Sequence, residues 1–285
     1  MVAVHHLVIH PPNWLGDVVM AQPAMRAFVT ALQPQRVTLV GRVWLQELAP
    51  WLDLGEVECA STIPTDGDAV VLLPNSIRVA WEAWRAGVAS RIGFRGQWRR
   101  PLLTYAPKPR HDMMRAHHRD YFLDLAEQYG IACGGSRVHL AIPAGAVERG
   151  VALLRQHGLD AARTVAIAPG AQFGGAKRYP ALRYREVAEG LTADGWQVVT
   201  IGTAAERAIC DSVVDGAAIG WSSAGVTTLT QALELIAASR LLLCNDSGMM
   251  HVAAGIGRAV VALFGATDPQ RTAPDGAEVQ LIYHP

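Results

Sequence analysis

The sequence predicts an α/β protein built from two Rossmann-like domains, each with a parallel sheet. Short runs rich in leucine and β-branched residues alternate with segments of helical period, and this alternation restarts near Thr164 after a polar, glycine-containing stretch at 143–163. The 285 residues also exceed the roughly 150 residues of one ordinary domain. Because repeated strand–helix–strand units form parallel sheets with helices on both faces, we expect domains at 1–155 and 156–285.

The expected strands follow one another along both halves of the chain. They lie at residues 7–10, 37–40, 69–73, 164–168, 197–201, 241–244 and 260–264, with helical segments such as 184–191 and 229–238 between them. Ligands of such sheets bind beyond the carboxyl ends of the strands. We therefore seek functional residues in the strand-to-helix loops. These loops contain neither the glycine fingerprint of nicotinamide dehydrogenases nor a P-loop, which disfavours both classes.

Composition and cysteine spacing indicate a globular protein of a reducing compartment. Hydrophobic residues make up 51% of the chain and charged residues 18%, which disfavours a disordered or fibrous class. The four cysteines show no Cys-x-x-Cys spacing, which argues against a zinc cluster, a redox pair or a disulfide framework. The N-terminus is not typical of an export signal, and no apolar run approaches the length of a membrane span. We expect a cytoplasmic protein whose membrane contact, if any, is peripheral.

The loop after the first strand ends in a carboxylate. It runs from Pro11 to Asp17 and leads into a helical segment, so Asp17 lies beyond a strand end at the start of a helix. Two interpretations stay open. Asp17 is a structural N-cap, or it is a general base that takes the proton from an acceptor hydroxyl.

A second candidate loop follows the strand at 164–168. Gly170 and Ala171 lie where backbone amides can approach an anion, and Lys177 supplies a positive charge that would offset the phosphates of a leaving diphosphate. Only Lys108 and Lys177 occur in this arginine-rich chain. The alternative is a surface lysine beside a helix-starting proline.

A third candidate loop follows the strand at 241–244. Ser247 and Gly248 place amide groups at a helix N-terminus, which favours a phosphate, and Asp246 would bond sugar hydroxyls. Asp246 and Ser247 are otherwise simple helix caps. His251, one turn into that helix, is either a ligand or a core residue. Glu206 would accept from ribose hydroxyls, although an exposed helical glutamate is the plainer interpretation.

Basic residues gather in the N-terminal half. Between Arg78 and Arg119 the chain carries ten basic residues against Glu82 and Asp112, a net of eight positive charges. This stretch is either a solvated face or a field that attracts an anionic partner. We interpret Trp81 and Trp84, which lie within it, as packing residues rather than sugar-stacking residues.

Taken together, the loops resemble those of the ADP-heptose:lipopolysaccharide heptosyltransferases of glycosyltransferase family 9, particularly the type that adds the second inner-core heptose. The matching motifs follow the order seen in that family and span nearly the whole chain. They lie at residues 12–17 (PNWLGD), 73–76 (LPNS), 169–171 (PGA) with 176–178 (AKR), 245–251 (NDSGMMH) and 265–269 (GATDP).

This resemblance implies a GT-B fold, in which the two parallel sheets face a central cleft, and inversion at the anomeric carbon without a metal or other cofactor. The implied partners are ADP-heptose and the anionic inner core of lipopolysaccharide, at the cytoplasmic face of the inner membrane and without nucleic acid. Asp17 resembles the general base of the family and Lys177 its diphosphate ligand. Asp246 resembles the family's contact to the donor sugar. The expected donor-binding residues are Gly170, Ala171, Lys177, Glu206, Asp246, Ser247, Gly248 and His251, and the expected acceptor-binding residues are Asn13, Arg78, Arg95, Arg99 and Arg115.

The sequence differs from the family pattern at its end. Family members continue past the Thr-Asp-Pro loop to a helix that closes on the N-terminal domain, whereas this sequence ends at Pro285. We expect this sequence to lack that closing helix, either as a fragment or as a shortened member of the family. A catalytically silent nucleotide-binding homologue therefore stays open as an alternative. Another GT-B enzyme with a different sugar or nucleotide, such as an epimerase of nucleotide sugars, is a further alternative.

Overall fold

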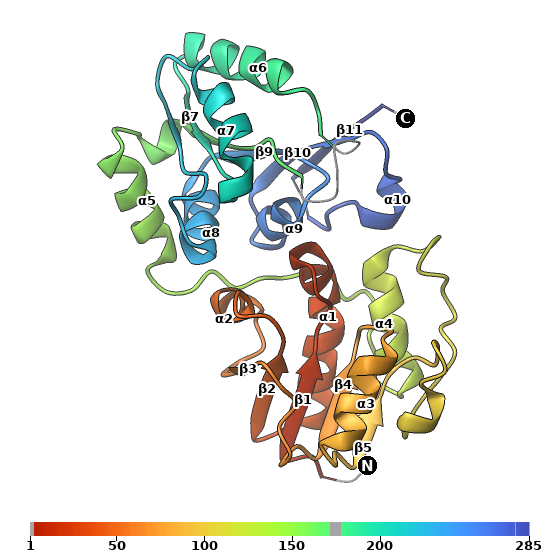
Figure 1. The fold of residues 1–285 in the computed structure, drawn as a ribbon. Coiled ribbons are helices and arrows are strands. Elements are labelled where there is room, and N and C mark those ends of the chain that lie inside the picture. The colour runs from red at the N-terminus through yellow and green to blue at the C-terminus, as the bar shows by residue number, and fades with distance from the viewer. Residues whose placement is uncertain (1–2, 172–177, 277, 285) are drawn as a thin grey trace. The chain divides into compact units, whose positions relative to one another are not determined.

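The computed structural model describes residues 3–171, 178–276 and 278–284. The chain divides into two compact units, Met1–Ala141 and Ile142–Pro285. Figure 1 colours the first unit from red to yellow-green and the second from green to blue. Each unit is one layered α/β domain.

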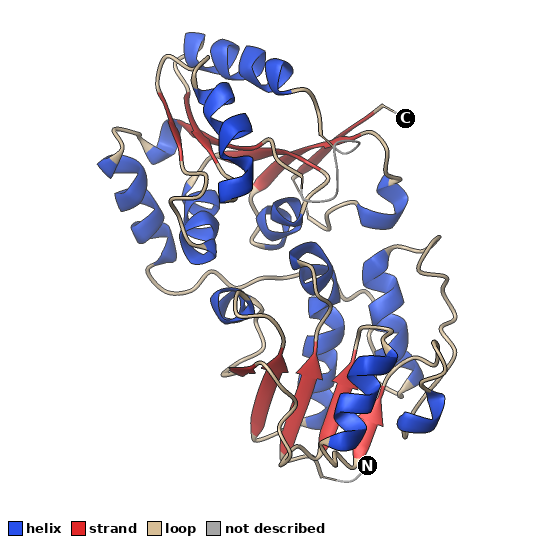
Figure 2. Ribbon diagram, viewed as in Figure 1, coloured by secondary structure: helices blue, strands red, loops and turns tan. Residues whose placement is uncertain are grey.

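The first unit contains one five-stranded sheet with helices on both faces (Figure 2). Its strands are β1 (His6–His10), β2 (Arg36–Val40), β3 (Glu58–Ala60), β4 (Ala69–Leu72) and β5 (Ser90–Ile92). Its helices are α1 (Leu15–Leu32), α2 (Leu45–Leu48), α3 (Ile77–Arg85) and α4 (His118–Gln128), with 3-10 turns η1 (Ala49–Trp51) and η2 (Arg100–Leu102).

All strand pairs of this sheet are parallel, in the order β3-β2-β1-β4-β5. The chain starts at a central strand, moves to one side and then returns to add strands on the other side. The strand order changes direction between the neighbouring strands β1 and β4, so the loops that follow these two strands leave the sheet on either side of this point. Such a switch point is where ligands bind in open parallel sheets.

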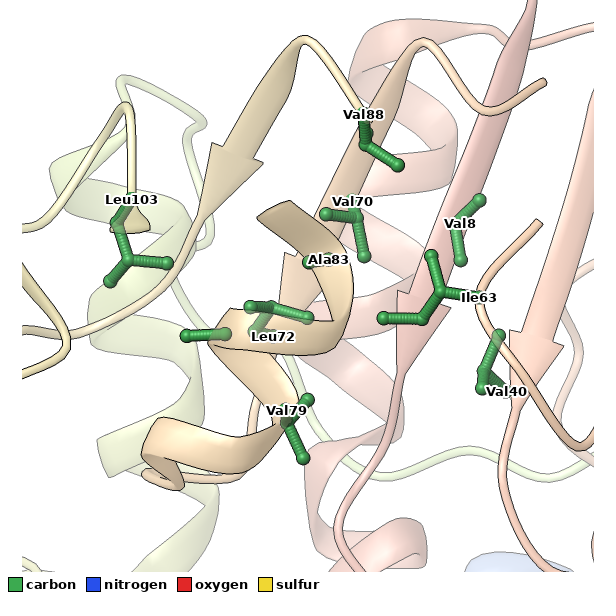
Figure 3. Packing of buried hydrophobic residues seen from close by; sticks show 10 residues of the cluster. Val8, Val40, Ile63, Val70, Leu72, Val79, Ala83, Val88 and Leu103 are labelled. Carbon is green, nitrogen blue, oxygen red and sulfur yellow. The ribbon is translucent and has the colours of Figure 1, made fainter. Parts of the chain in front are cut away.

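Helix α3 packs on one face of the sheet through small and branched side chains. Val79, Ala80 and Ala83 belong to a buried cluster with Val8 of β1 and Leu72 of β4 (Figure 3). Successive strand residues point to opposite faces, so the neighbours of Val8 in β1 face the side that α1 and α4 cover. The sheet is buried on both faces, as its nearly continuous apolar strands predict.

The second unit contains a six-stranded sheet. Its strands are β6 (Thr164–Ala168), β7 (Gln197–Thr200), β8 (Gly220–Ser222), β9 (Leu241–Asn245), β10 (Ala259–Phe264) and β11 (Val279–Tyr283). Its helices are α5 (Ala146–Gln156), α6 (Ala181–Ala193), α7 (Arg207–Val214), α8 (Leu229–Ala238), α9 (Gly248–Gly255) and α10 (Pro269–Thr272), with 3-10 turns η3 (Ala161–Arg163) and η5 (Ala204–Glu206).

The strand order of this sheet, β11-β10-β9-β6-β7-β8, is again parallel throughout and again reverses beside its first strand. The switch point lies between β6 and β9. One face of the sheet packs on α6 and α7 through Tyr184, Ala188 and Val213. Tyr184 is fully buried there. Both units therefore place a ligand-binding edge where two predicted motif loops meet.

The structure confirms each strand expected from the sequence to within one residue at either end. Within the described residues it adds four strands, of which three are three-residue strands, too short for the pattern of alternation to detect. The division between units falls at Ala141, earlier than the predicted boundary at 155, because α5 belongs to the second unit. Gly150 of α5 contacts the backbone of Glu234 in α8, and Arg149 bonds the Glu234 carboxylate at 2.5 Å.

Two other structural findings bear on the sequence analysis. Trp81 and Trp84 do not pack in the core: their exposed fractions are 45% and 53%, which corrects that interpretation. Within the described parts of the chain, no helix combines the length and apolarity needed to cross a membrane.

Candidate active site

Asp17 lies in the first turn of α1, directly beyond the carboxyl end of β1. The N-cap of this helix is Trp14, whose side chain makes no capping hydrogen bond, so Asp17 is not the N-cap. A carboxylate at this position interacts favourably with the positive end of the helix dipole. One quarter of the Asp17 side chain is exposed, which leaves it partly open to solvent.

A histidine of α4 holds this carboxylate. His118 Nδ1 lies 3.4 Å from Asp17 Oδ1, a long hydrogen bond between the first turns of two packed helices. The contact favours the tautomer in which Nδ1 carries the proton and donates to Asp17. Nε2 of His118 is buried and has no hydrogen-bond partner among the described residues. The tautomer with its proton on Nδ1 leaves only a lone pair unsatisfied there, rather than a buried N–H donor.

The neighbouring loop after β4 is fixed by a buried arginine. Arg99 donates to the carbonyls of Phe94, at 2.7 Å, and of Pro74, and to Asn75 Oδ1 at 3.0 Å. Asn75 in turn donates to the hydroxyl of Tyr121, one turn along α4 from His118. The loops after β1 and β4 are thus both tied to the first turns of α4.

The buried state of Arg99 corrects its predicted role as a direct acceptor ligand. Its side chain is fully buried, and desolvation lowers its pKa to about 10. It donates to two carbonyl oxygens and an amide oxygen, and all three acceptors are uncharged. It therefore positions the loop instead of offering an exposed cation.

The other predicted acceptor residues are exposed. Asn13 lies in the loop before α1, Arg95 in the loop after β5, and Arg115 in the segment before α4. Arg78 lies in the first turn of α3, where it pairs with Glu82 at 2.6 Å on the helix surface. These exposed side chains are available to an anionic ligand.

In the second unit, Asn245 organises the switch point. This buried residue ends β9, and its Nδ2 donates to the carbonyls of Pro169, at 2.8 Å, and of Gly170, at 3.3 Å. Its Oδ1 accepts from the Tyr179 amide at 3.1 Å and the Tyr184 hydroxyl at 2.9 Å. These contacts of the side-chain amide join the loop after β6 to α6 and the segment that leads into it.

Gly170 and Glu206 lie against each other at the edge formed by β6 and β7. A Cβ at residue 170 would lie 2.1 Å from Glu206 Oε1, so a larger residue here would displace the Glu206 carboxylate. The other oxygen, Oε2, accepts from the Thr203 amide and hydroxyl, both at 2.9 Å, as part of a capping box. Glu206 is therefore a fixed carboxylate beside the loop of Gly170, rather than a freely exposed helical glutamate.

The loop after β9 brings the remaining donor candidates together. Asp246 accepts from the Thr267 hydroxyl at 2.7 Å, which joins this loop to the one after β10. Ser247 is the N-cap of α9 but makes no side-chain capping bond, and its buried hydroxyl has no partner among the described residues. Gly248 begins the helix, whose first amides have no intrahelical acceptors. His251 is buried one turn later.

Lys177 lies outside the described residues. Its neighbour Arg178 donates to the carbonyl of Ala171 at 3.2 and 3.3 Å, which places the segment after Lys177 beside the loop of β6. In the described part of the chain, no group of three or more His, Cys, Asp and Glu side chains could hold a metal ion. That the reaction needs no metal stays a prediction.

The two units present different chemical groups at their switch points. The first unit presents a carboxylate suited to accepting a proton, and the second presents loops, a helix N-terminus and a buried unpaired hydroxyl suited to a phosphorylated ligand. The model of glycosyltransferase family 9 (heptosyltransferase) matches residues 65–284, well over half of the chain. The chain belongs to glycosyltransferase family 9.

Relatives in this family match along almost the full chain. Lipopolysaccharide heptosyltransferase 2 of Escherichia coli (strain K12) is 29% identical and aligns with 97% of this chain and 87% of its own length. The structure of E. coli ADP-heptose LPS heptosyltransferase II has a TM-score of 0.83 and 28% identity, covering 98% of this chain and 92% of that one. A family 9 structure from Veillonella parvula has a TM-score of 0.85 at 21% identity, covering 98% and 86%, and supports the fold alone.

These matches confirm the expected family, the two-sheet α/β architecture of GT-B enzymes and the glycosyltransferase class. The predicted central cleft and the individual site residues stay predictions. Sequence reasoning missed His118 and the linking role of Asn245. No local sequence pattern indicated His118, because its partner Asp17 is 101 residues away in the chain.

Proposed function

We propose that this family 9 enzyme transfers a heptose from ADP-heptose to the inner core of lipopolysaccharide, with inversion at the anomeric carbon. The observation that carries the proposal is the match of 97% of the chain to a relative named lipopolysaccharide heptosyltransferase 2. The solved E. coli relative is an ADP-heptose LPS heptosyltransferase, which supports the choice of donor. The loops at the two switch points carry groups suited to such a transfer, which supports the proposal.

In the proposed reaction, an acceptor hydroxyl attacks the anomeric carbon of the heptose. Asp17 takes the hydroxyl proton while the bond between that carbon and the diphosphate oxygen breaks, and ADP leaves with the bonding electrons. His118 keeps Asp17 oriented through its Nδ1 proton, so it is a positioning residue. The presence of this supported carboxylate favours an active enzyme over a silent homologue.

The second unit would bind the donor. Gly170, Ala171 and the first turn of α9, with Ser247 and Gly248, would face the diphosphate, and Lys177 would offset its charge as ADP departs. Asp246, held by Thr267, would accept from heptose hydroxyls, and Glu206 from the ribose. This binding mode uses no metal, because backbone amides and a lysine neutralise the diphosphate.

The first unit would bind the acceptor. The exposed arginines Arg78, Arg95 and Arg115 suit an acceptor that carries phosphates and acidic sugars. Because such an acceptor is anchored in a bilayer, we propose that the enzyme works as a peripheral protein on the cytoplasmic face of the inner membrane.

The test is transfer by the purified chain from ADP-heptose to heptose-deficient lipopolysaccharide, followed by ADP release and by the mass of the product. A panel of ADP- and UDP-linked sugars in the same assay checks the donor. Preference for a uridine nucleotide would overturn the donor assignment. Normal ADP binding by calorimetry without any turnover, under conditions in which a relative is active, would instead establish the silent homologue.

A further inference from the structure

One face of α3 carries exposed aromatic side chains that the proposed transfer does not use. The inner face of this helix is already packed, since Val79, Ala80 and Ala83 belong to the core cluster in Figure 3. Ile77, Trp81 and Trp84 follow the spacing i, i+4, i+7 and form a second stripe on the helix surface. Their exposed fractions are 46%, 45% and 53%. Helix α3 is therefore apolar on two faces, of which only one is buried.

A third tryptophan is found in the adjoining loop. Trp98 is 94% exposed and is separated by one residue from η2, which contacts α3. Its φ of 60° and the φ of 45° at Gln97 place both residues in the left-handed region. Bulky residues rarely adopt this conformation, which costs about 1 kcal/mol or more. The loop therefore holds a large apolar ring in solvent although two of its backbone conformations are unfavourable.

Positive charge surrounds these rings. The Arg85 guanidinium lies 5.3 Å from the centroid of the Trp81 ring, and Arg78 is exposed on the same helix. Arg95 and Arg100 flank Trp98 in the sequence and are also exposed. Glu82, the one acidic residue of α3, is paired with Arg78. Tryptophan and arginine side by side are typical of surfaces that bind at the headgroup level of a bilayer.

We propose that Ile77, Trp81, Trp84 and Trp98, with Arg78 and Arg85, form a surface that docks on an anionic phospholipid bilayer. This α3 tryptophan surface would insert its rings between the headgroups while its arginines pair with lipid phosphates. A bilayer is favoured over a protein partner because exposed arginines outnumber the one acidic residue, Glu82, around these rings, and because the rings lie on a helix surface rather than in a pocket. The assignment rests on the proposed function in one respect, since an acceptor anchored in a membrane explains why an enzyme would need such a surface.

The experiment is co-sedimentation of the full chain with vesicles that contain no lipopolysaccharide. Vesicles of mixed phosphatidylglycerol and phosphatidylcholine should bind the chain, pure phosphatidylcholine should bind it weakly, and added salt should weaken binding. The double variant Trp81→Ser/Trp84→Ser should bind the anionic vesicles about tenfold more weakly. Trp98→Ser should also weaken binding, and at 94% exposure it leaves folding unaffected. The control is Leu182→Ser in α6, whose side chain is 65% exposed in the second unit and which should bind as the unchanged chain does.

Unchanged vesicle binding in both tryptophan variants would overturn the proposal, as would equal binding to neutral and anionic vesicles. A third contrary outcome is that the variants keep vesicle binding but lose transfer to a deacylated, soluble acceptor, because the tryptophans would then belong to the saccharide site. Failure of the proposed function is separate from these outcomes: the chain would bind anionic vesicles through α3 yet transfer no heptose to any acceptor.

Discussion

The pair formed by Asp17 and His118 gives the sharpest prediction. If Asp17 is the proposed proton acceptor, replacing it by Asn should lower kcat by about a hundredfold or more. Replacing His118 by Phe removes only the donor that orients the carboxylate. At 3.4 Å between Nδ1 and Oδ1, this hydrogen bond is long, so we assign it about 1 kcal/mol, or about a fivefold loss in kcat.

The control is His118→Asn, which keeps an amide donor close to the position of Nδ1 and should restore most of the lost kcat. In the Asp17→Asn background, His118→Phe should have no further effect, because the interaction that it removes is already absent. Steady-state transfer kinetics give kcat and KM, and calorimetry gives ADP affinity, which should stay unchanged in all variants. An equal loss from His118→Phe in both backgrounds, or no restoration by Asn, would show that His118 acts only through packing and would refute the positioning role.

Three further substitutions test the fold that supports the sites, each by urea unfolding. Arg99→Lys should lower the free energy of unfolding by about 2–4 kcal/mol, because lysine cannot donate to all three buried acceptors of Arg99. Its control is Arg95→Lys at an exposed position, which should change the free energy of unfolding by less than about 0.5 kcal/mol. Burial lowers the pKa of His10 below its ordinary value of 6.5 in the folded state, so the unfolded state takes up a proton at a higher pH than the folded state does. The free energy of unfolding should therefore fall as the pH drops below about 6.5. His10→Asn should make that fall shallower. Gly150→Ala should destabilise the second unit by about 3 kcal/mol, because its Cβ would lie 2.2 Å from the Glu234 carbonyl oxygen, and an unchanged midpoint would contradict this close packing of α5 on α8.

The sequence was sufficient to predict the fold because the central strands of both sheets are almost entirely buried. Their central strands are continuous apolar runs, for which local pattern and tertiary position agree. Edge strands such as β3 and β8 escaped prediction because three residues carry little periodicity, and their stability comes from pairing with a neighbour. The domain boundary was misplaced for a related reason: nothing in the pattern of α5 reveals that it packs on α8.

The sequence located the loops that the structure brings to the switch points, but not the residues that hold those loops in place. A parallel sheet brings the carboxyl ends of its strands to one edge, so residues just after a strand are candidates, and Asp17, Gly170 and Asp246 were predicted as site residues in this way. What fixes such a residue comes from elsewhere in the chain. His118 acts through a contact that spans 101 residues, and Asn245 through contacts that span 61 to 76 residues, and no local spacing encodes those distances.

Arginine shows why residue type alone misleads at such a site. Arg78, Arg95 and Arg99 occur in one basic stretch and were all predicted to contact an anionic acceptor, yet the structure buries Arg99 and leaves the other two exposed. A buried guanidinium is stable here because its planar fork reaches several carbonyl and amide oxygens at once, which neither lysine nor a single ion pair would satisfy. Its charge is nonetheless retained behind the loop after β4, in a medium of low dielectric constant where a cation acts over a longer range than at the surface. Under the proposed function, Arg99 would add to the attraction of an anionic acceptor without touching it, so a loss of acceptor affinity in an Arg99 variant would not by itself establish a contact.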